Sequence, residues 1–276
     1  MHSQIGCEFI YESLAPTPMT FIVRPRERDA HLLLEEFRVV EPETVTHTYV
    51  DSYGNTCWRV LAPAGTLRLR YEAIAEHSDQ PDPVLDDLPI AQVEDLPDDV
   101  LVYTLPSRFC QSDIVLLDAW NLFGQTPPNW QRVQAICDWV QANLTYVSGS
   151  SMSSTSGFDA YQQRRGVCSD FAHVAVMLCR AMNIPARYCS GYMGDIGVPS
   201  DGYPMDFHAW FEAYVGGAWR TFDARYNTPR IGRVLISRGR DAVDAALTTI
   251  YGPSKLTHFK VWADQVEDEV RLPQAQ

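Results

Sequence analysis

The sequence predicts an α+β fold, in which an all-β, sandwich-like first part is followed by a part built from helices and a strand hairpin. Short runs of β-branched and aromatic residues, separated by Pro and Gly, fill the first 76 residues. After Ser107 the apolar residues recur instead at the three- and four-residue steps of amphipathic helices. We therefore expect a β-rich domain over residues 1–78, an acidic connection over 79–106 and a second domain over 107–276.

Size, composition and charge narrow the class of protein. The chain has 276 residues, of which 46% are hydrophobic, and this suffices for the cores of two domains. Its 35 acidic and 22 basic residues give a net charge of −13, which disfavours nucleic acid as a partner because phosphate groups would be repelled. The sequence has no apolar run of about eighteen residues, and its start, MHSQIGCEFIYESL, lacks the basic and apolar regions of a signal peptide. We expect a cytoplasmic protein that does not act in a membrane.

The cysteines do not indicate a disulfide framework or a structural zinc site. There are seven, an odd number, and no two of them form a CxxC pair: Cys7, Cys57, Cys110, Cys137, Cys168, Cys179 and Cys189. By default each is a reduced thiol that packs as a small apolar side chain. The acidic residues lack the spacing of a calcium-binding loop, so no metal site is predicted.

In the first domain, strands are expected at FIYESL, MTFIVRP, HLLLEEFRVV, VTHTYV, TCWRVL and GTLRLRYEAIA. The segment DSYGN at 51–55 predicts a hairpin turn, in which Gly54 and Asn55 are able to adopt positive φ. The connection over 79–106 is rich in acids and prolines and has no Lys or Arg, which is typical of a solvated linker.

In the second domain, two helices are predicted by apolar stripes over 115–123 and 130–144, and the second begins after Pro127 and Pro128. A third, buried helix is predicted within GVCSDFAHVAVMLCRAMNIP, which starts at Gly166. Cys168 falls in its first turn, where unpaired N–H groups and the helix dipole favour a thiolate. That position alone does not distinguish a catalytic cysteine from a structural one.

A strand hairpin follows this helix. FHAWFEAYV alternates as a strand does, GGAW makes a turn and WRTFDAR returns. The first strand carries His208 and the second Asp223, so their side chains can be neighbours across the pair. A helix-borne cysteine that faces them would complete a set of nucleophile, base and orienting group.

The order of these segments closely resembles the core of transglutaminase-like enzymes. The resemblance covers roughly residues 110–255 and is carried by GVCSDFAHVAVMLCRAMNIPARYCSGY, then DFHAWFEAYVGGAWRTFDARYN. The upstream β-rich region resembles the N-terminal β-domain of bacterial members, and GRDAVDAAL resembles their C-terminal signature. The resemblance implies an α+β, papain-like core and acyl chemistry at an amide or thioester, with no metal or organic cofactor.

Carried over residue by residue, the resemblance makes Cys168 the nucleophile, His208 its base and Asp223 the group that holds the imidazole. A thiolate–imidazolium pair at a helix start would hold the pKa of Cys168 below the ordinary value of about 8.5. The N–H of Cys168 is one natural oxyanion donor. Candidates for a second donor are Tyr161, Gln162 and Gln163, while Tyr192 and Trp210 could flank the cleft or simply pack.

Three functions stay open. Hydrolysis of an amide or peptide bond needs only water as second substrate and is preferred, because nothing in the sequence marks a site for an amine. Amine transfer to a protein glutamine, the transglutaminase reaction, is the alternative, and a non-catalytic scaffold that keeps the fold is the third. A peptide:N-glycanase is disfavoured because the zinc-binding CxxC pairs of that family are absent. The first domain could serve as a lid, a substrate platform or the surface of a homo-oligomer.

Overall fold

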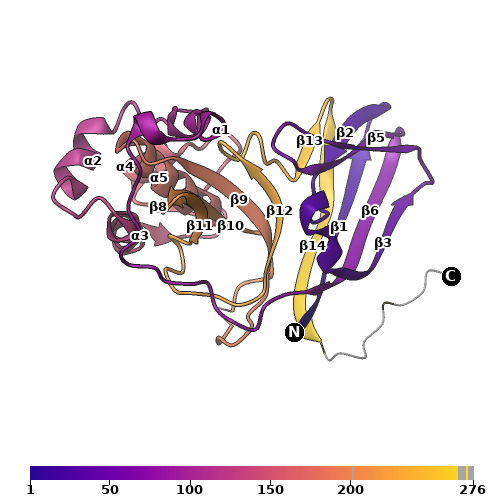
Figure 1. The fold of residues 1–276 in the computed structure, drawn as a ribbon. Coiled ribbons are helices and arrows are strands. Elements are labelled where there is room, and N and C mark those ends of the chain that lie inside the picture. Colours follow the sequence, from indigo (N-terminus) through magenta and orange to yellow (C-terminus); the bar gives the residue numbers. More distant parts are fainter. Residues whose placement is uncertain (201, 267–271, 273–276) are drawn as a thin grey trace.

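The computed structural model of the chain consists of a β-sandwich and a helix-and-sheet half that lie side by side (Figure 1). It describes residues 1–200, 202–266 and 272. One sheet of the sandwich has the order β14 (Ser254–Val266), β1 (His2–Ser13), β6 (Gly65–Glu76) and β3 (Leu33–Glu41). The other has the order β13 (Thr248–Ile250), β2 (Thr17–Phe21), β5 (Thr56–Ala62) and β4 (Thr46–Val50). The predicted α+β class, with a strand-rich first part, is confirmed.

Alternation along the strands builds the core between the two sheets. Inward residues of β1 and β6, such as Phe9 and Tyr71, meet inward residues of β2 and β5. Phe9 lies edge-on to Phe21 with ring centroids 6.0 Å apart, and Tyr71 lies edge-on to Trp58 at 5.5 Å. These aromatic pairs bury large apolar surfaces in a geometry that aromatic rings favour.

The turn over 51–55 joins β4 to β5 as predicted, but only one of its two expected residues has positive φ. Gly54 has φ +78°, whereas Asn55 is not among the described residues with positive φ. Asn55 is instead fully buried, where its side chain donates to Asp51 and to the carbonyl of Arg238. Asn55 therefore ties the hairpin to the second half and does not adopt a positive φ in the turn.

The last strands correct the expected extent of the second domain, residues 107–276. Over its whole length β14 pairs antiparallel with β1, from Ser254 opposite Ser13 to Val266 opposite His2, and β13 pairs with β2. Residues 248–266 therefore belong to the sandwich sheets. The unpaired edges of β1 and β2 explain this, because a strand edge needs hydrogen-bond partners and the returning chain supplies them. The part of the predicted domain over residues 267–271 and 273–276 lies outside the described residues.

The acidic connection packs against the second half and is more than a solvated linker. Asp82 accepts from Arg233 Nε at 2.9 Å and from the backbone N–H of Arg230. Leu85, Leu88 and Ile90 pack on the helical core. The segment then forms short helical turns at Val93–Asp95, α1 (Asp98–Leu101) and Val102–Thr104. One of its acids, Asp82, thus has partners in two arginines far along the chain.

The second half places helices against one face of an antiparallel sheet of order β11 (Ala218–Phe222), β10 (His208–Val215), β9 (Ala186–Met193) and β12 (Arg233–Gly239). The helices are α2 (Leu116–Phe123), α3 (Trp130–Asn143), α4 (Gly157–Gln163) and α5 (Cys168–Ala181), and β7 (Thr145–Tyr146) pairs in parallel with β8 (Arg165–Gly166). The central helix α5 is buried along nearly all its length and packs on β10 and β9. The three helices predicted from apolar stripes are confirmed.

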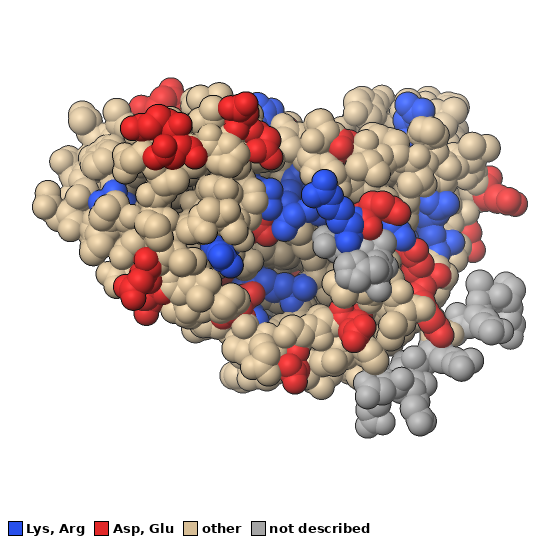
Figure 2. Space-filling view, viewed as in Figure 1, with Lys and Arg blue, Asp and Glu red and all other residues tan. Residues whose placement is uncertain are grey.

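The two halves share a core. Tyr192 of β9 and Val234 and Ile236 of β12 belong to the same apolar cluster as the sandwich interior, as does Phe207, which precedes β10. Figure 2 shows the largest group of Lys and Arg side chains near the middle of one face, where the halves meet. Within the second sheet, Arg187 of β9 and Arg238 of β12 both form ion pairs with Glu212 of β10. No helix in the described chain is long and apolar enough to cross a membrane.

Candidate active site

Cys168 occupies the first position of α5 and is the one partly exposed thiol among the seven cysteines, all of which are described. The helix begins there because the buried carboxylate of Asp170 accepts the N–H of Val167 at 2.7 Å and so caps the first turn. Gly166 makes this possible, since a Cβ at that position would lie 2.5 Å from the Cβ of Asp170. The cap also receives the hydroxyl of Ser151, which ties the serine-rich loop to the start of α5.

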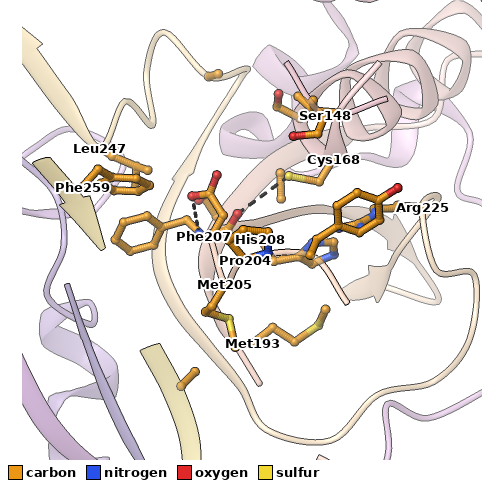
Figure 3. A pocket seen from close by; sticks show the side chains of 18 of the residues that line it. Ser148, Cys168, Met193, Pro204, Met205, Phe207, His208, Arg225, Leu247 and Phe259 are labelled. Carbon is orange, nitrogen blue, oxygen red and sulfur yellow. Dashed lines mark hydrogen bonds between the residues drawn. The ribbon is translucent and has the colours of Figure 1, made fainter. Parts of the chain in front are cut away.

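The thiol faces the beginning of β10. Its S–H donates to the carbonyl oxygen of Phe207, with sulfur and oxygen 3.8 Å apart. Phe207 directly precedes His208, and both Cys168 and His208 line one cavity (Figure 3). The strand thus presents a base to the side of the helix start that carries the sulfur.

His208 is bonded to Asp223 across the β10–β11 hairpin. Its Nε2 lies 2.7 Å from Oδ2 of Asp223, and both side chains are almost fully buried. Because an ionised carboxylate can only accept, Nε2 carries the proton and Nδ1 keeps its lone pair. The histidine is therefore held in the tautomer that can accept a proton at Nδ1.

Asp223 is fully satisfied by four donors. Oδ2 accepts from His208 and from Arg233 Nη2 at 2.9 Å, while Oδ1 accepts the backbone N–H groups of Arg225 and Tyr226, each at 3.1 Å. The other end of Arg233 is bonded to Asp82 of the connection. Arg233 thus links the segment between the two halves to the carboxylate behind His208.

Burial and charge set the protonation of these groups. Burial alone would raise the pKa of Asp223, but the charges of His208 and Arg233 and their hydrogen bonds hold it well below its usual range. Burial lowers the pKa of His208 against the opposing effect of Asp223, and burial raises the pKa of Cys168 to about 11. Both shifts favour the neutral forms of the thiol and the imidazole, and the shift of the Cys168 pKa is opposite in direction to the predicted one, because burial outweighs the hydrogen bond from the backbone N–H of Ala209 that lowers the thiol pKa.

The cavity that holds both side chains has a volume of about 960 Å³. Helix α5 and the serine-rich loop, with Ser148 and Gly149, form one side of it, and the segment 203–208 forms another. Strands β1 and β14 of the sandwich form the far wall, with Phe259 labelled there in Figure 3. Its size is within the range of clefts that hold a peptide segment or a small ligand.

Three residues predicted as oxyanion candidates lie outside this cavity. Tyr161 is buried in the helical core, where it stacks on Trp139 and donates to Asp118 at 3.1 Å. Gln162 and Gln163 are exposed on α4. None of the three is among the described residues that line the cavity. The cause is that α4 ends before Arg164, which has φ +58°, so the chain reverses before it reaches Cys168.

Tyr192 and Trp210 pack near the site without lining the cavity, within the part of the chain that the structure describes. Tyr192 is fully buried and donates to the carbonyl of Val23 at 2.8 Å, so it fixes β9 to the sandwich. Trp210 is stacked beside His208 with ring centroids 6.2 Å apart, and the guanidinium of Arg233 lies over it at 5.1 Å. Trp210 therefore forms part of the support behind the imidazole.

The sequence did not reveal two residues of the site, Arg233 beside the carboxylate of Asp223 and Ser148 in the cavity that holds the thiol. Arg233 follows Asp223 by ten positions, and only the sheet order, which places β12 beside β9, brings it back to the carboxylate. Ser148 reaches the cavity because the N–H of Val147 donates to the carbonyl of Gly166 at 3.0 Å, beside the start of α5. The serine-rich composition of 148–156 was the available signal for a loop at the cleft.

No group of three or more His, Cys, Asp or Glu side chains in residues 1–200, 202–266 and 272 could hold a metal ion. The polar side chains that line the cavity include a thiol, an imidazole, hydroxyls, carboxylates, an amide and the guanidinium of Arg225. This set suits nucleophilic attack on a carbonyl with proton transfer through the imidazole.

Comparison with known proteins identifies a superfamily and several relatives. A family model of the transglutaminase-like superfamily matches residues 121–224, a stretch that includes Cys168, His208 and Asp223. An uncharacterized protein of Mycobacterium leprae is 26% identical over 270 residues, which cover 92% of this chain and 93% of that protein. An uncharacterized protein of Mycobacterium tuberculosis is 27% identical over 213 residues, covering 70% of this chain and 68% of that protein.

A solved structure extends the match to the whole fold. The crystal structure of a "putative cysteine protease" from Cytophaga hutchinsonii is 34% identical, covers 98% of this chain and 92% of that chain, and superposes with a TM-score of 0.85. The combination of a β-sandwich and a papain-like core is therefore shared along nearly the full length of both chains.

Proposed function

The chain belongs to the transglutaminase-like superfamily, and from that premise we propose that it is a cysteine hydrolase of amide or peptide bonds. Cys168 is the nucleophile, His208 the general base and Asp223 the group that orients the base. The observation that carries the proposal is the arrangement in one cavity of a partly exposed thiol at a helix start and a histidine bonded at 2.7 Å to a buried carboxylate.

The reaction begins from the neutral pair. His208 accepts the S–H proton at Nδ1 as the sulfur of Cys168 attacks the substrate carbonyl, which forms the tetrahedral intermediate. The imidazolium, stabilised by the charge of Asp223, then gives its proton to the leaving amine as the C–N bond breaks and a thioester remains. Water attacks the thioester with His208 again as base, and the acid leaves as the thiol is restored.

The oxyanion of the intermediate needs donors near the sulfur. The N–H of Cys168 is free of an intrahelical partner because it lies in the first turn of α5. We propose the hydroxyl of Ser148 as the second donor, because it lines the cavity and lies on the segment that is bonded to Gly166. Such donors contribute most when they are fixed in place before the reaction.

The test is a profile of peptide and amide substrates with the wild type beside Cys168→Ala. We expect turnover that Cys168→Ala and His208→Ala each abolish, while Cys57→Ala, which removes a thiol from the sandwich, keeps it. Far-UV circular dichroism of each variant controls for folding. Turnover that survives in a folded Cys168→Ala protein would sink the proposal.

A primary amine in the same reactions separates the two acyl acceptors. Release of the free acid without conjugate supports hydrolysis. Formation of an amide conjugate with a glutamine peptide, dependent on Cys168, would overturn hydrolysis in favour of amine transfer. Absence of turnover and of acyl-enzyme formation across the whole library would favour a scaffold role.

A further inference from the structure

The β-sandwich supplies one wall of the catalytic cavity. Phe9 and Tyr11 of β1, Leu256 and Phe259 of β14, and Leu247 before β13 all line it. Phe9 and Phe259 lie directly opposite each other in the β1–β14 ladder. Strand β14, which returns from the second half, therefore supplies the other part of the apolar surface that begins on β1.

Aromatic contacts run from this wall to the nucleophile. The ring of Phe259 lies 5.1 Å from that of Phe9 and 6.1 Å from that of Phe207, between centroids. The carbonyl of Phe207 accepts the S–H of Cys168. The wall is therefore close enough to the nucleophile for one substrate to contact both. Its carbonyl would lie at the sulfur of Cys168, and one of its side chains would pack on the wall.

Parts of the wall are open to solvent. Phe259 is 37% exposed and Leu256 is 43% exposed, although both face a concave surface. Scattered apolar residues on a convex surface need no explanation, but adjacent ones inside a cleft indicate a ligand site. A ligand bound here must carry a bulky apolar group that covers the exposed parts of Phe259 and Leu256 and removes them from water.

The charged residues around the cavity further restrict the kind of ligand that fits it. Among the described residues that line it, Asp195, Asp206 and Asp264 are acidic and Arg225 is basic, with its guanidinium 3.8 Å from the centre of the Tyr146 ring. Asp206 is exposed in the cavity, and among the described contacts its carboxylate accepts the N–H of Phe207, its own neighbour in the chain. The nearby protein nevertheless desolvates it and raises its pKa, so a cation beside it would be stabilising.

We propose that the substrate is a peptide segment that carries a bulky apolar side chain, which packs on the sandwich wall at Phe259, and a positively charged group, which lies beside Asp206. The sandwich is then a substrate platform. This inference rests on the proposed function for the position of the scissile bond, but the binding it describes needs no chemistry.

The test uses three matched peptides that differ at two positions: Phe with Lys, Ala with Lys, and Phe with Glu. We expect kcat/KM for the first to exceed that for the second by at least about tenfold, since one apolar group in a pocket discriminates by that order. We expect a similar factor between the first and the third, because like charges placed together oppose binding.

Two variants assign each preference to its residue. Phe259→Ala should reduce the Phe over Ala ratio to within about threefold of unity, and Asp206→Asn should do the same to the Lys over Glu ratio, each without effect on the other ratio. Leu14→Ala is the matched control, because Leu14 is 88% exposed on the sandwich and is not among the described residues of the cavity wall.

Binding is measured separately with fluorescein-labelled peptides and Cys168→Ala, by anisotropy. Preference for the Phe and Lys peptide in binding, lost in the double variants with Phe259→Ala and Asp206→Asn, supports the inference even if no peptide is cleaved. Cysteine-dependent cleavage with equal kcat/KM for all three peptides would overturn the inference and leave the proposed function standing. Equal affinities for the three peptides would overturn it as well.

Discussion

Replacement of Arg233 by Met tests the support behind the candidate base. The side chain of Arg233 is 8% exposed and that of Asp223 is 3% exposed, and 2.9 Å separates Nη2 from Oδ2. The substitution leaves two carboxylates, of Asp223 and Asp82, without their cation. Removal of one partner of a buried ion pair costs about 3–5 kcal/mol, so we expect a loss of that order in the free energy of unfolding at pH 7.

The loss should depend on pH in a defined direction. The pKa of Asp223 is depressed in the folded wild type, so its contribution to stability is present above the unfolded value of about 3.9 and is lost as the pH falls toward the folded value. In Arg233→Met the folded pKa moves up toward that unfolded value. The difference in stability between wild type and variant should therefore be largest near neutral pH and shrink below about pH 4.

Activity provides a readout that loss of stability alone would not change. The charge of Arg233 lowers the pKa of His208, so its removal should move the acid limb of kcat/KM to higher pH. Because Arg233 acts through Asp223, we expect the pH-independent value of kcat/KM in Arg233→Met to fall by about tenfold, or ~1.4 kcal/mol.

The assays are urea unfolding followed by circular dichroism and the pH profile of kcat/KM. The control is Arg238→Met on the same strand, whose partner Glu212 keeps Arg187. An acid limb that stays in place in Arg233→Met, together with a stability loss no larger than that of the control, would refute the reasoning.

Three further predictions follow from the same contacts. Alkylation of Cys168 by iodoacetamide should accelerate with pH toward the thiol pKa of about 11, and a plateau reached below pH 8 would show a thiolate in the resting enzyme. Ser148→Ala should lower kcat by roughly 10²-fold with little change in KM, and an unchanged kcat would remove its hydroxyl as oxyanion donor. Tyr192→Phe, which deletes the bond to Val23, should lower the free energy of unfolding by about 1 kcal/mol and leave kcat/KM unchanged, as urea unfolding and a rate assay would show.

The sequence was informative wherever a local pattern determines the structure. The helix that starts at Cys168 was predictable because its apolar residues recur at helical steps and a glycine precedes it. The hairpin that joins His208 to Asp223 was predictable because strand alternation is interrupted by two glycines, both with positive φ. That His208 and Asp223 lie close together follows from the pairing of the two strands alone.

Contacts set by topology could not be read from the sequence. Arg233 reaches Asp223 only because β12 pairs with β9, and no periodicity states which strands are neighbours. The same holds for β14, which looked like the end of the second domain and pairs instead with β1 at the other end of the chain. The direction of the Cys168 pKa shift could not be predicted, because the helix start is visible in the sequence, whereas the burial that raises the thiol pKa is not.

The path of the chain also explains why the cavity needs both halves. The chain leaves the sandwich after β6, builds the helices and the second sheet, and returns through β13 and β14 to close both sandwich sheets. A fragment cut at residue 107 would keep Cys168 and His208 but would lack β1, the partner of β14, and would expose Tyr192 to water. The aromatic wall and the nucleophile are therefore fixed relative to each other by one continuous core, and a substrate that contacts the wall is positioned by the same packing that positions the thiol.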